Sequence, residues 1–306
     1  MNWLKIKTYG ALTLVSLLYG INFSVLKIVV PNYVGPFGFI IFRISCALVV
    51  FWIFQWIFSS DRIDWKQDGW RLVACGLTGI AVNQLLFYKG ISLTSAVNGS
   101  IMMTLTPILV LIWASIISKE KITYTKVLGI ACGLAGALII VLRSGKTGGD
   151  TLGDFYVLLN GASYALFLVI VKPLIAKYNP LTVTTWCFTF GLLFALPVGW
   201  SEAVAVDFST FTPAVWYSTA YAIIGVTIIL YFLNSWTLLH VPSSVVGSFI
   251  YLQPVFATLT AILFFGEVFL LKHLVAMLLV FLGVTLVTTT PGQLMKLVSF
   301  NKKKQG

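Results

Sequence analysis

Long apolar segments recur along the whole chain, separated by short polar or glycine-rich connections. A helix needs about 20 apolar residues to cross the hydrocarbon core of a bilayer. Ten segments of about that length are predicted, at residues 8–30, 37–58, 70–88, 96–117, 123–142, 154–176, 181–200, 213–235, 243–265 and 270–289. They are too evenly apolar for the alternating strands of a membrane barrel. We therefore predict an all-α membrane protein with ten transmembrane helices.

Composition supports a bilayer rather than water as the solvent of this chain. Of its 306 residues 59 % are hydrophobic and only 9 % are charged, too few charges to cover a water-soluble surface. The net charge of +11 does not indicate nucleic acid, because the basic residues lie between apolar runs and not on one polar face. The expected partners are therefore the lipid bilayer and a small-molecule substrate, and nucleic acid is not expected.

The placement of lysine and arginine predicts the orientation. With the N-terminus inside, most basic residues collect on the cytoplasmic side, as the positive-inside rule requires. The cytoplasmic set is Lys5, Lys7, Arg62, Lys66, Arg71, Lys119, Lys121, Lys126, Lys172, Lys177, Lys296 and Lys302 to Lys304. The opposite side keeps Lys89, Arg143, Lys146 and Lys272, with Lys27 near its edge. We expect a multi-pass protein of the bacterial inner (plasma) membrane with both termini cytoplasmic.

The chain repeats itself at a shift of about 145 residues. Matching pairs are Tyr19 and Tyr164, Lys27 and Lys172, Tyr33 and Tyr178, Gly79 and Gly225, Pro107 and Pro254, Glu120 and Glu267, and Gly136 and Gly283. We predict a first repeat at 1–144, a linker at 145–153, a second repeat at 154–290 and a basic tail at 291–306. Five spans are an odd number, so the second repeat must be inverted, an arrangement that recurs in secondary transporters.

The chain also resembles a known family. The residues that carry the resemblance are Tyr19-Gly20-x-Asn22-Phe23, Tyr251-Leu252-Gln253-Pro254 followed by Gly266-Glu267, and the echo Thr106-Pro107 with Lys119-Glu120. In these positions it is similar to the EamA family of the drug/metabolite transporter superfamily, from about residue 8 to residue 289. The resemblance implies ten helices, cytoplasmic termini, a central cavity, and movement of amino acids or other small metabolites, often as export.

Neutral polar and aromatic residues inside the spans are the candidate substrate-binding residues, because a metabolite carrier needs a few hydrogen-bonding groups on an apolar wall. They are Tyr19, Asn22, Asn83, Gln84, Tyr88, Asn98, Met102, Tyr164, Trp186, Tyr231, Asn234, Ser248, Tyr251 and Gln253. Each of them could equally serve as a hydrogen bond between helices. As a set they favour a cavity lining, since they are sparse in the fifth and tenth spans.

Five further residues stand out. Pro107 and Pro254 break the fourth and ninth spans, as hinges or as packing kinks. Glu120 and Glu267 stand where the next helix begins, which favours a structural role at its N-terminal amides over proton handling. Arg43 lies inside the second span. It either contacts a substrate carboxylate or snorkels to the outer interface or to a helix C-terminus, and the sequence favours snorkelling.

No enzyme signature is present: there is no G-x-S-x-G, P-loop, HExxH or dinucleotide-binding turn, and neither cofactor nor metal is expected. The predicted function is a secondary transporter or facilitator with alternating access. Because no carboxylate lies at a predicted midplane, proton antiport is not favoured over facilitated diffusion or exchange. Alternatives are a non-transporting receptor or scaffold, and a multidrug or nucleobase/sugar carrier. A monomer and a homodimer both fit the sequence.

Overall fold

The structure is a computed structural model that describes residues 3–59, 61–117, 119, 123–142, 150–230, 233, 236–237, 240 and 249–288. Within these ranges the regular structure is helical and no strand forms. The prediction of an all-α protein is therefore confirmed for this part of the chain.

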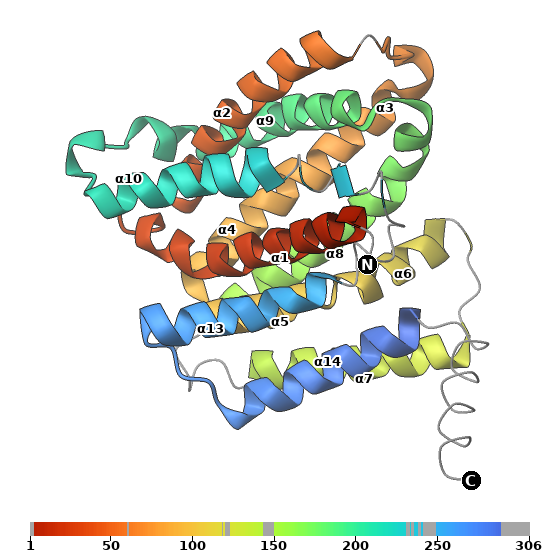
Figure 1. Ribbon diagram of the computed structural model, residues 1–306, viewed down its shortest axis with the longest axis vertical. Coiled ribbons are helices and arrows are strands. Elements are labelled where there is room, and N and C mark those ends of the chain that lie inside the picture. The colour runs from red at the N-terminus through yellow and green to blue at the C-terminus, as the bar shows by residue number, and fades with distance from the viewer. Residues whose placement is uncertain are drawn as a thin grey trace.

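The helices follow one another in two halves (Figure 1). The first half contains α1 (Trp3–Val29), α2 (Pro36–Phe58), α3 (Trp65–Cys75), the π-helix η1 (Gly76–Val82), α4 (Asn83–Leu93), α5 (Ala96–Met103), α6 (Thr106–Ile117) and α7 (Tyr124–Leu142). The second contains α8 (Thr151–Lys177), α9 (Pro180–Val204), the 3-10 turn η3 (Phe208–Thr210), α10 (Pro213–Ala220), the π-helix η4 (Tyr221–Ile229), the 3-10 turn η5 (Phe249–Leu252), α13 (Gln253–Phe265) and α14 (Leu271–Thr288).

Every predicted span overlaps helical residues of this structure. Six helical stretches are long and apolar enough to cross a membrane: Ile6–Val29, Pro36–Phe58, Trp65–Leu93, Ala96–Ile117, Thr151–Lys177 and Pro180–Val204. Shorter apolar helices are Pro213–Ile229, Gln253–Phe265 and Leu271–Gly283. The chain is thus a multi-pass membrane protein, while the full count of ten spans stays a prediction.

Several helices begin before the apolar residues from which they were predicted. The third was expected from residue 70, but α3 starts at Trp65 because Asp64 accepts hydrogen bonds from Lys66 N and Gln67 N. Asp150 caps α8 in the same way through Leu152 N. These polar caps satisfy amides that a hydropathy window does not count, so the helices extend past their apolar part.

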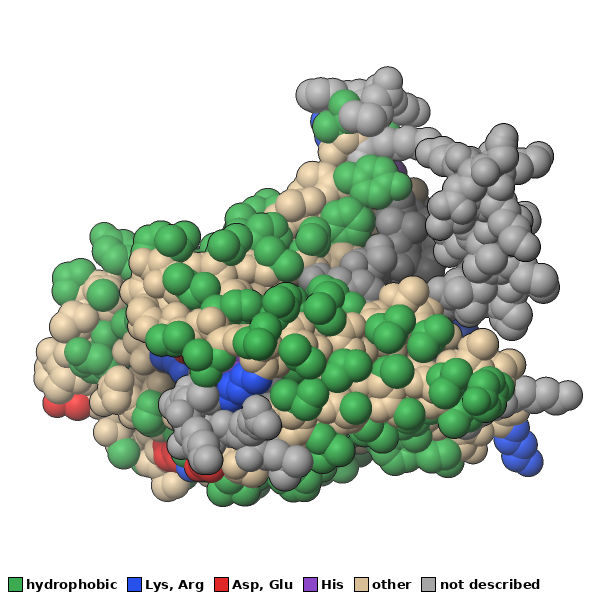
Figure 2. Space-filling view, turned by 90° about the horizontal axis from the view of Figure 1, so that it is seen from below, with side chains coloured by type: hydrophobic (Ala, Val, Ile, Leu, Met, Phe, Trp, Pro, Cys, Tyr) green, Lys and Arg blue, Asp and Glu red, His purple; other side chains and the backbone are tan. Residues whose placement is uncertain are grey.

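The bundle is held together by contacts between the two halves. In Figure 1, α7 runs along α14 and α2 runs along α9, while α1 packs on α13 and α6 packs on α8. α1 begins and α14 ends on the same side of the bundle. Large hydrophobic side chains are exposed on the outside, among them Trp56 (86 %) and Phe264 (79 %). Figure 2 shows one such face, where hydrophobic side chains are widespread and charged ones are few.

Glycines let α7 and α14 approach each other closely. A Cβ atom placed on Gly283 would lie 2.5 Å from the carbonyl oxygen of Gly129 and 2.7 Å from the nitrogen of Gly133. Gly136 faces α14 in return, since its Cβ would lie 2.9 Å from the carbonyl oxygen of Ala276. The Gly129-x-x-x-Gly133 pattern therefore serves packing within the monomer.

Candidate functional site

The regular α-helix begins directly before a proline at corresponding places in the two halves. α5 ends at Met103, residues 104–105 form a turn, and Pro107 is the second residue of α6. In the second half η5 leads into α13, whose second residue is Pro254. A helix start tolerates proline because its amides lack intrahelical partners there. The break predicted at Pro107 is present as the turn at residues 104–105. At Pro254 the 3-10 turn η5 continues directly into α13, so a break there and a hinge motion at either proline stay predictions.

The two π-helices also correspond. η1 begins at Gly76 and η4 begins at Tyr221, which matches the shift of about 145 residues between the repeats. A π-helix widens the turn and leaves some backbone groups without their usual partners, and such segments occur often at functional sites. The sequence gives no period from which they could be predicted.

Arg43 of α2 bonds both α4 and the π-helix η4 from a buried position. With 7 % of its surface exposed, its Nε donates a hydrogen bond to Thr227 Oγ1 of η4 at 2.5 Å. Nη1 donates to Gln84 Oε1 at 3.1 Å and to the Tyr88 hydroxyl at 2.5 Å, both on α4. The guanidinium thus stays inside the bundle and does not snorkel to the interface, the alternative that the sequence favoured. We call Arg43, Gln84, Tyr88 and Thr227 the arginine cluster.

The partners of Arg43 are all neutral. No acidic side chain in the described part of the chain pairs with it. Tyr88 is itself 1 % exposed and its ring lies 5.6 Å from the Arg43 Cζ. Thr227 was not among the predicted site residues. A single hydroxyl in an apolar segment often bonds only to the backbone of its own helix, and Thr227 also makes such a bond, to Ala222 O at 3.0 Å.

Two of the predicted substrate-binding residues, Asn83 and Asn98, form hydrogen bonds between helices rather than with Arg43. Asn83 and Asn160 exchange hydrogen bonds, from Asn160 Nδ2 to Asn83 O at 2.7 Å and from Asn83 Nδ2 to Asn160 O at 3.4 Å, which ties α4 to α8. Asn98 donates from Nδ2 to Asp154 Oδ2 at 3.2 Å, and Thr94 donates to the other oxygen of that carboxylate. Asp154 stands at a helix start, as the sequence indicated, yet it is fully buried.

The remaining predicted residues are spread over several elements. Asn22 of α1 is 3 % exposed, and its Oδ1 accepts no hydrogen bond within the described ranges. Met102 is buried, whereas Tyr19, Tyr164 and Gln253 are partly buried. Trp186 packs edge-on against Trp52 at 5.0 Å and Trp65 at 4.6 Å, two exposed side chains, and not against the arginine cluster.

Some predicted residues lie outside the part of the chain that the structure describes. These are Tyr231, Asn234, Ser248 and Glu120, together with the side chain of Tyr251. Their roles stay predictions.

Glu267 binds the N-terminus of a helix, but not of the helix that was expected. The sequence pointed to the helix that follows it, whereas its carboxylate accepts from Ala96 N at 3.0 Å and Val97 N at 3.3 Å, the first residues of α5. Lys27 Nζ also lies 3.1 Å from its Oε1. Gly266, with φ of 65°, makes the reversal that turns the carboxylate toward α5. The contact joins α1, α5 and the α13–α14 connection.

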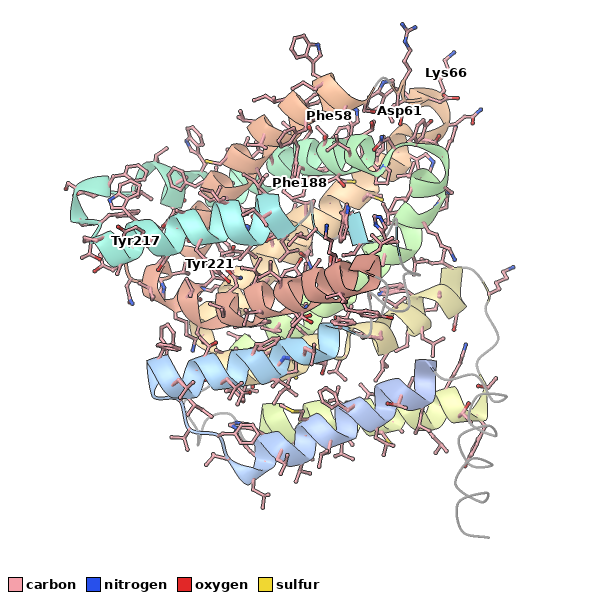
Figure 3. The ribbon with its side chains drawn as sticks, in the orientation of Figure 1. Phe58, Asp61, Lys66, Phe188, Tyr217 and Tyr221 are labelled. Carbon is pink, nitrogen blue, oxygen red and sulfur yellow. The ribbon has the colours of Figure 1, made fainter. Side chains whose placement is uncertain are left out.

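Two carboxylates link α2 and α9, and the sequence did not indicate either contact. Glu202 near the end of α9 accepts from Phe37 N at 2.7 Å and Gly38 N at 2.9 Å at the start of α2. Asp61, just after α2, accepts from Asn179 N directly before α9. Figure 3 places Asp61 beyond the end of α2, near Lys66. Each of the two paired helices is therefore capped by a carboxylate that lies beside the other helix's end.

Comparison with known proteins agrees with this repeated architecture. The model of the EamA-like transporter family matches residues 6–142 and again residues 151–289, so the domain is duplicated. An uncharacterized transporter of Bacillus subtilis, YyaM, is 26 % identical over 298 residues, which are 95 % of each chain. A probable terminal-alkyne amino-acid exporter of Streptantibioticus cattleyicolor is 26 % identical over 264 residues, 86 % of each chain.

A solved crystal structure shares the fold. It superposes with a TM-score of 0.61 at 16 % identity, covering 90 % of this chain and 95 % of the other. The two adjoining family matches leave only the connection between the halves and the chain ends unmatched. This chain therefore belongs to the EamA-like transporter family of membrane proteins.

Proposed function

We propose that this protein is a bacterial inner-membrane carrier for small organic carboxylates, amino acids or close relatives, which it exports by alternating access. The observation that carries the proposal is the buried Arg43, whose hydrogen-bond partners within the described residues are all neutral. A cation at membrane depth without an anion is costly, and such residues commonly mark substrate or ion pathways. A substrate carboxylate would supply the missing charge and accept two parallel hydrogen bonds from the guanidinium.

The position of the arginine supports a carrier mechanism. Arg43 bonds α4 just after the π-helix η1 and bonds the π-helix η4 itself, so it spans both halves of the chain. In inverted-repeat transporters the substrate site lies between the halves, where irregular helices line the cavity. A movement of one half against the other would then change the access of the guanidinium to either side.

The rest of the proposed architecture follows the sequence. The domains are the repeats at 1–144 and 154–290 joined by the linker 145–153, with ten spans, inverted halves and cytoplasmic termini. Since α1 begins and α14 ends on the same side of the bundle, the two termini are proposed to lie on one side of the membrane. The distribution of lysine and arginine supports the cytoplasmic side. Pro107 and Pro254 are proposed as hinges because each is the second residue of an α-helix that follows a turn or a 3-10 segment.

Asn22 is the second residue that we assign to the substrate. Its buried Oδ1 accepts no hydrogen bond in the described part of the chain, and a buried acceptor without a donor is unfavourable. An ammonium or amide donor on the substrate would satisfy it. This acceptor favours amino acids over simple organic acids, in keeping with the probable amino-acid exporter among the relatives.

Counterflow in liposomes tests the proposal. Purified protein is reconstituted, the vesicles are loaded with unlabelled alanine or phenylalanine, and uptake of the radiolabelled amino acid is followed. We expect wild-type protein to accumulate label and Arg43→Gln to lose at least about nine-tenths of the rate, as loss of a charged hydrogen-bonded contact predicts. Arg62→Gln, an exposed arginine after α2, is the matched control. Wild-type rates in Arg43→Gln would refute the site.

A further inference from the structure

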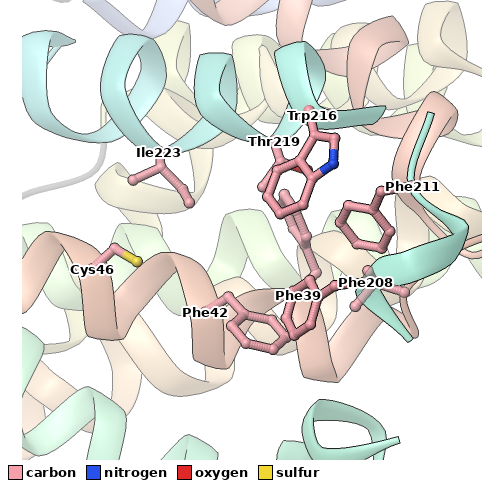
Figure 4. A pocket seen from close by; sticks show the side chains of 9 residues that line it. Phe39, Phe42, Cys46, Phe208, Phe211, Trp216, Thr219 and Ile223 are labelled. Atoms are coloured by element: carbon pink, nitrogen blue, oxygen red, sulfur yellow. The ribbon is translucent and has the colours of Figure 1, made fainter. Parts of the chain in front are cut away.

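A cavity of about 190 Å³ lies between the start of α2 and the segment from η3 to η4 (Figure 4). Its walls carry mostly aromatic side chains. The lining residues are Val34, Phe39, Phe42, Cys46, Phe208, Phe211, Trp216, Thr219 and Ile223. We call this cavity the aromatic pocket.

The aromatic wall is formed by rings that hold one another. Phe208 meets Phe42 edge-on with ring centres 5.4 Å apart, and it stacks on Trp216 at 6.1 Å. Phe211 lies 5.0 Å from Trp216. Such edge and offset contacts fix ring orientations, so the wall is preformed for an apolar guest.

The surface that this pocket offers to a guest is wholly apolar. The Thr219 side chain lines the pocket through its carbon atoms, whereas its hydroxyl is buried behind the wall and makes no hydrogen bond with any residue that the structure describes. The pocket therefore suits an apolar ring and has no polar group for a substituent on it.

The aromatic pocket and the arginine cluster share two helix faces. On α2, Phe39 and Cys46 lie four residues before and three residues after Arg43, spacings that place all three on one face. On the opposite wall, Thr219 and Ile223 of the pocket precede Thr227 of the cluster by eight and four residues. Phe39 also contacts the Tyr88 ring at 5.6 Å. The pocket therefore lies about one helical turn from the guanidinium.

The size of the pocket fits one ring. An apolar cavity of about 150 Å³ in another protein accommodates benzene, and this one is slightly larger. A solute whose carboxylate binds Arg43 can extend an apolar side chain along the same helix faces into this space.

We infer that the aromatic pocket is the side-chain subsite of the carrier and selects carboxylates that bear an apolar ring. The inference rests on the proposed function and adds the substrate class to it. Burial of a ring in such a pocket should favour the binding of a ring-bearing amino acid, such as phenylalanine, by about tenfold or more over alanine.

The test compares the transport of phenylalanine and alanine in the counterflow assay. Ile223→Trp fills the pocket from η4, and Cys46→Phe fills it from α2. Ile224→Trp is the matched control, since Ile224 is the next residue of η4 and is 53 % exposed on the outside. Gel filtration and thermal unfolding verify that each variant is folded.

We expect wild-type protein to move phenylalanine faster than alanine by about tenfold, and both filling variants to reduce that ratio to near one. Ile224→Trp should keep the ratio.

The outcomes separate the two proposals. Transport of both amino acids at equal rates, with no effect of the filling variants on the ratio, overturns the subsite and leaves the proposed function standing. If neither amino acid, nor any carboxylate in a wider panel, is carried by folded protein, the proposed function fails. Equal loss of the ratio in Ile224→Trp also overturns the subsite, since that residue does not line the pocket.

Discussion

The Nη1 atom of Arg43 and the hydroxyl oxygen of Tyr88 lie 2.5 Å apart, with both residues buried. The oxygen accepts from the guanidinium, so the phenol proton of Tyr88 must point elsewhere. In the proposed carrier, that proton would bond a substrate carboxylate at Arg43. Tyr88 would then hold the arginine and contact the substrate at once.

Tyr88→Phe separates these roles from simple packing, because it removes one oxygen and keeps the ring. Hydrogen bonds to charged groups contribute about 1.5 to 3 kcal/mol. We expect counterflow to fall by about tenfold or more, while the fold survives through Gln84 and Thr227. The apparent affinity from rate against amino-acid concentration gives the measurement.

Tyr217→Phe is the control for Tyr88→Phe. Tyr217 lies on α10, points outward in Figure 3 and is 78 % exposed, so loss of its hydroxyl should leave transport within about twofold of wild type. Similar losses in both variants would show that Tyr88 has no special link to the substrate.

The reciprocal carboxylates at α2 and α9 predict a graded loss of stability. Glu202→Ala removes two hydrogen bonds to α2 amides, and Asp61→Ala removes one exposed bond to Asn179 N. We expect about 1 to 2 kcal/mol for the first and less than about 1 kcal/mol for the second, from the range of cap substitutions. Thermal unfolding in detergent measures both.

Additivity checks the interpretation. The two caps stand at opposite ends of α2, so the double variant should lose the sum of the two within about 0.5 kcal/mol. An Asp61→Ala effect larger than that of Glu202→Ala would contradict the cap model, since Asp61 is exposed and makes the single bond.

The sequence was sufficient for the positions of the helices but not for their internal shape. Apolar length placed helical residues in every predicted span, because the bilayer sets the length of a spanning segment. The π-helices at Gly76 and Tyr221 carry no such signal, since a widened turn changes neither hydropathy nor composition. They are visible only as backbone geometry.

Only part of the candidate site could be predicted, because contacts between helices depend on the fold and not on local sequence. Gln84 and Tyr88 stood out as polar side chains in an apolar segment, and both proved to be partners of Arg43. Whether Arg43 itself reached the interface could not be told from its place in the chain, because snorkelling depends on what the neighbouring helices leave open. Glu202 and Asp61 were missed because their partners are more than a hundred residues away.

The location of the acidic residues predicts how transport responds to pH. Asp68 and Asp154 are buried, but each is the fourth residue of its helix, and each carboxylate already has protein donors. No described carboxylate stands midway along a spanning helix. We therefore expect counterflow without a pH gradient, and an imposed gradient should not raise the steady accumulation of amino acid by more than about twofold.

Asp154→Asn sharpens this prediction. The amide keeps the size of the side chain and loses its charge, so a coupled carrier would lose gradient-driven uptake while keeping exchange. We expect gradient-driven uptake and exchange to change together, because the substitution weakens the contacts of residue 154 with Thr94 and Asn98. Accumulation that follows the gradient in wild type and disappears only in Asp154→Asn would assign proton coupling to this residue.

Close packing of α7 on α14 predicts that even a methyl group at Gly283 is harmful. Its Cβ would lie 2.5 Å from the Gly129 carbonyl oxygen and 3.2 Å from the Gly133 Cα, and backbone atoms cannot rotate away. Overpacking of this kind costs about 1 to 3 kcal/mol.

Gly10→Ala is the matched control, because nothing lies within 4 Å of a Cβ there. Within helix α1, that alanine should raise stability by up to about 1 kcal/mol. Unfolding temperatures that move in opposite directions would support α7–α14 contact within one chain, whereas an unchanged Gly283→Ala protein would show that the two helices are farther apart.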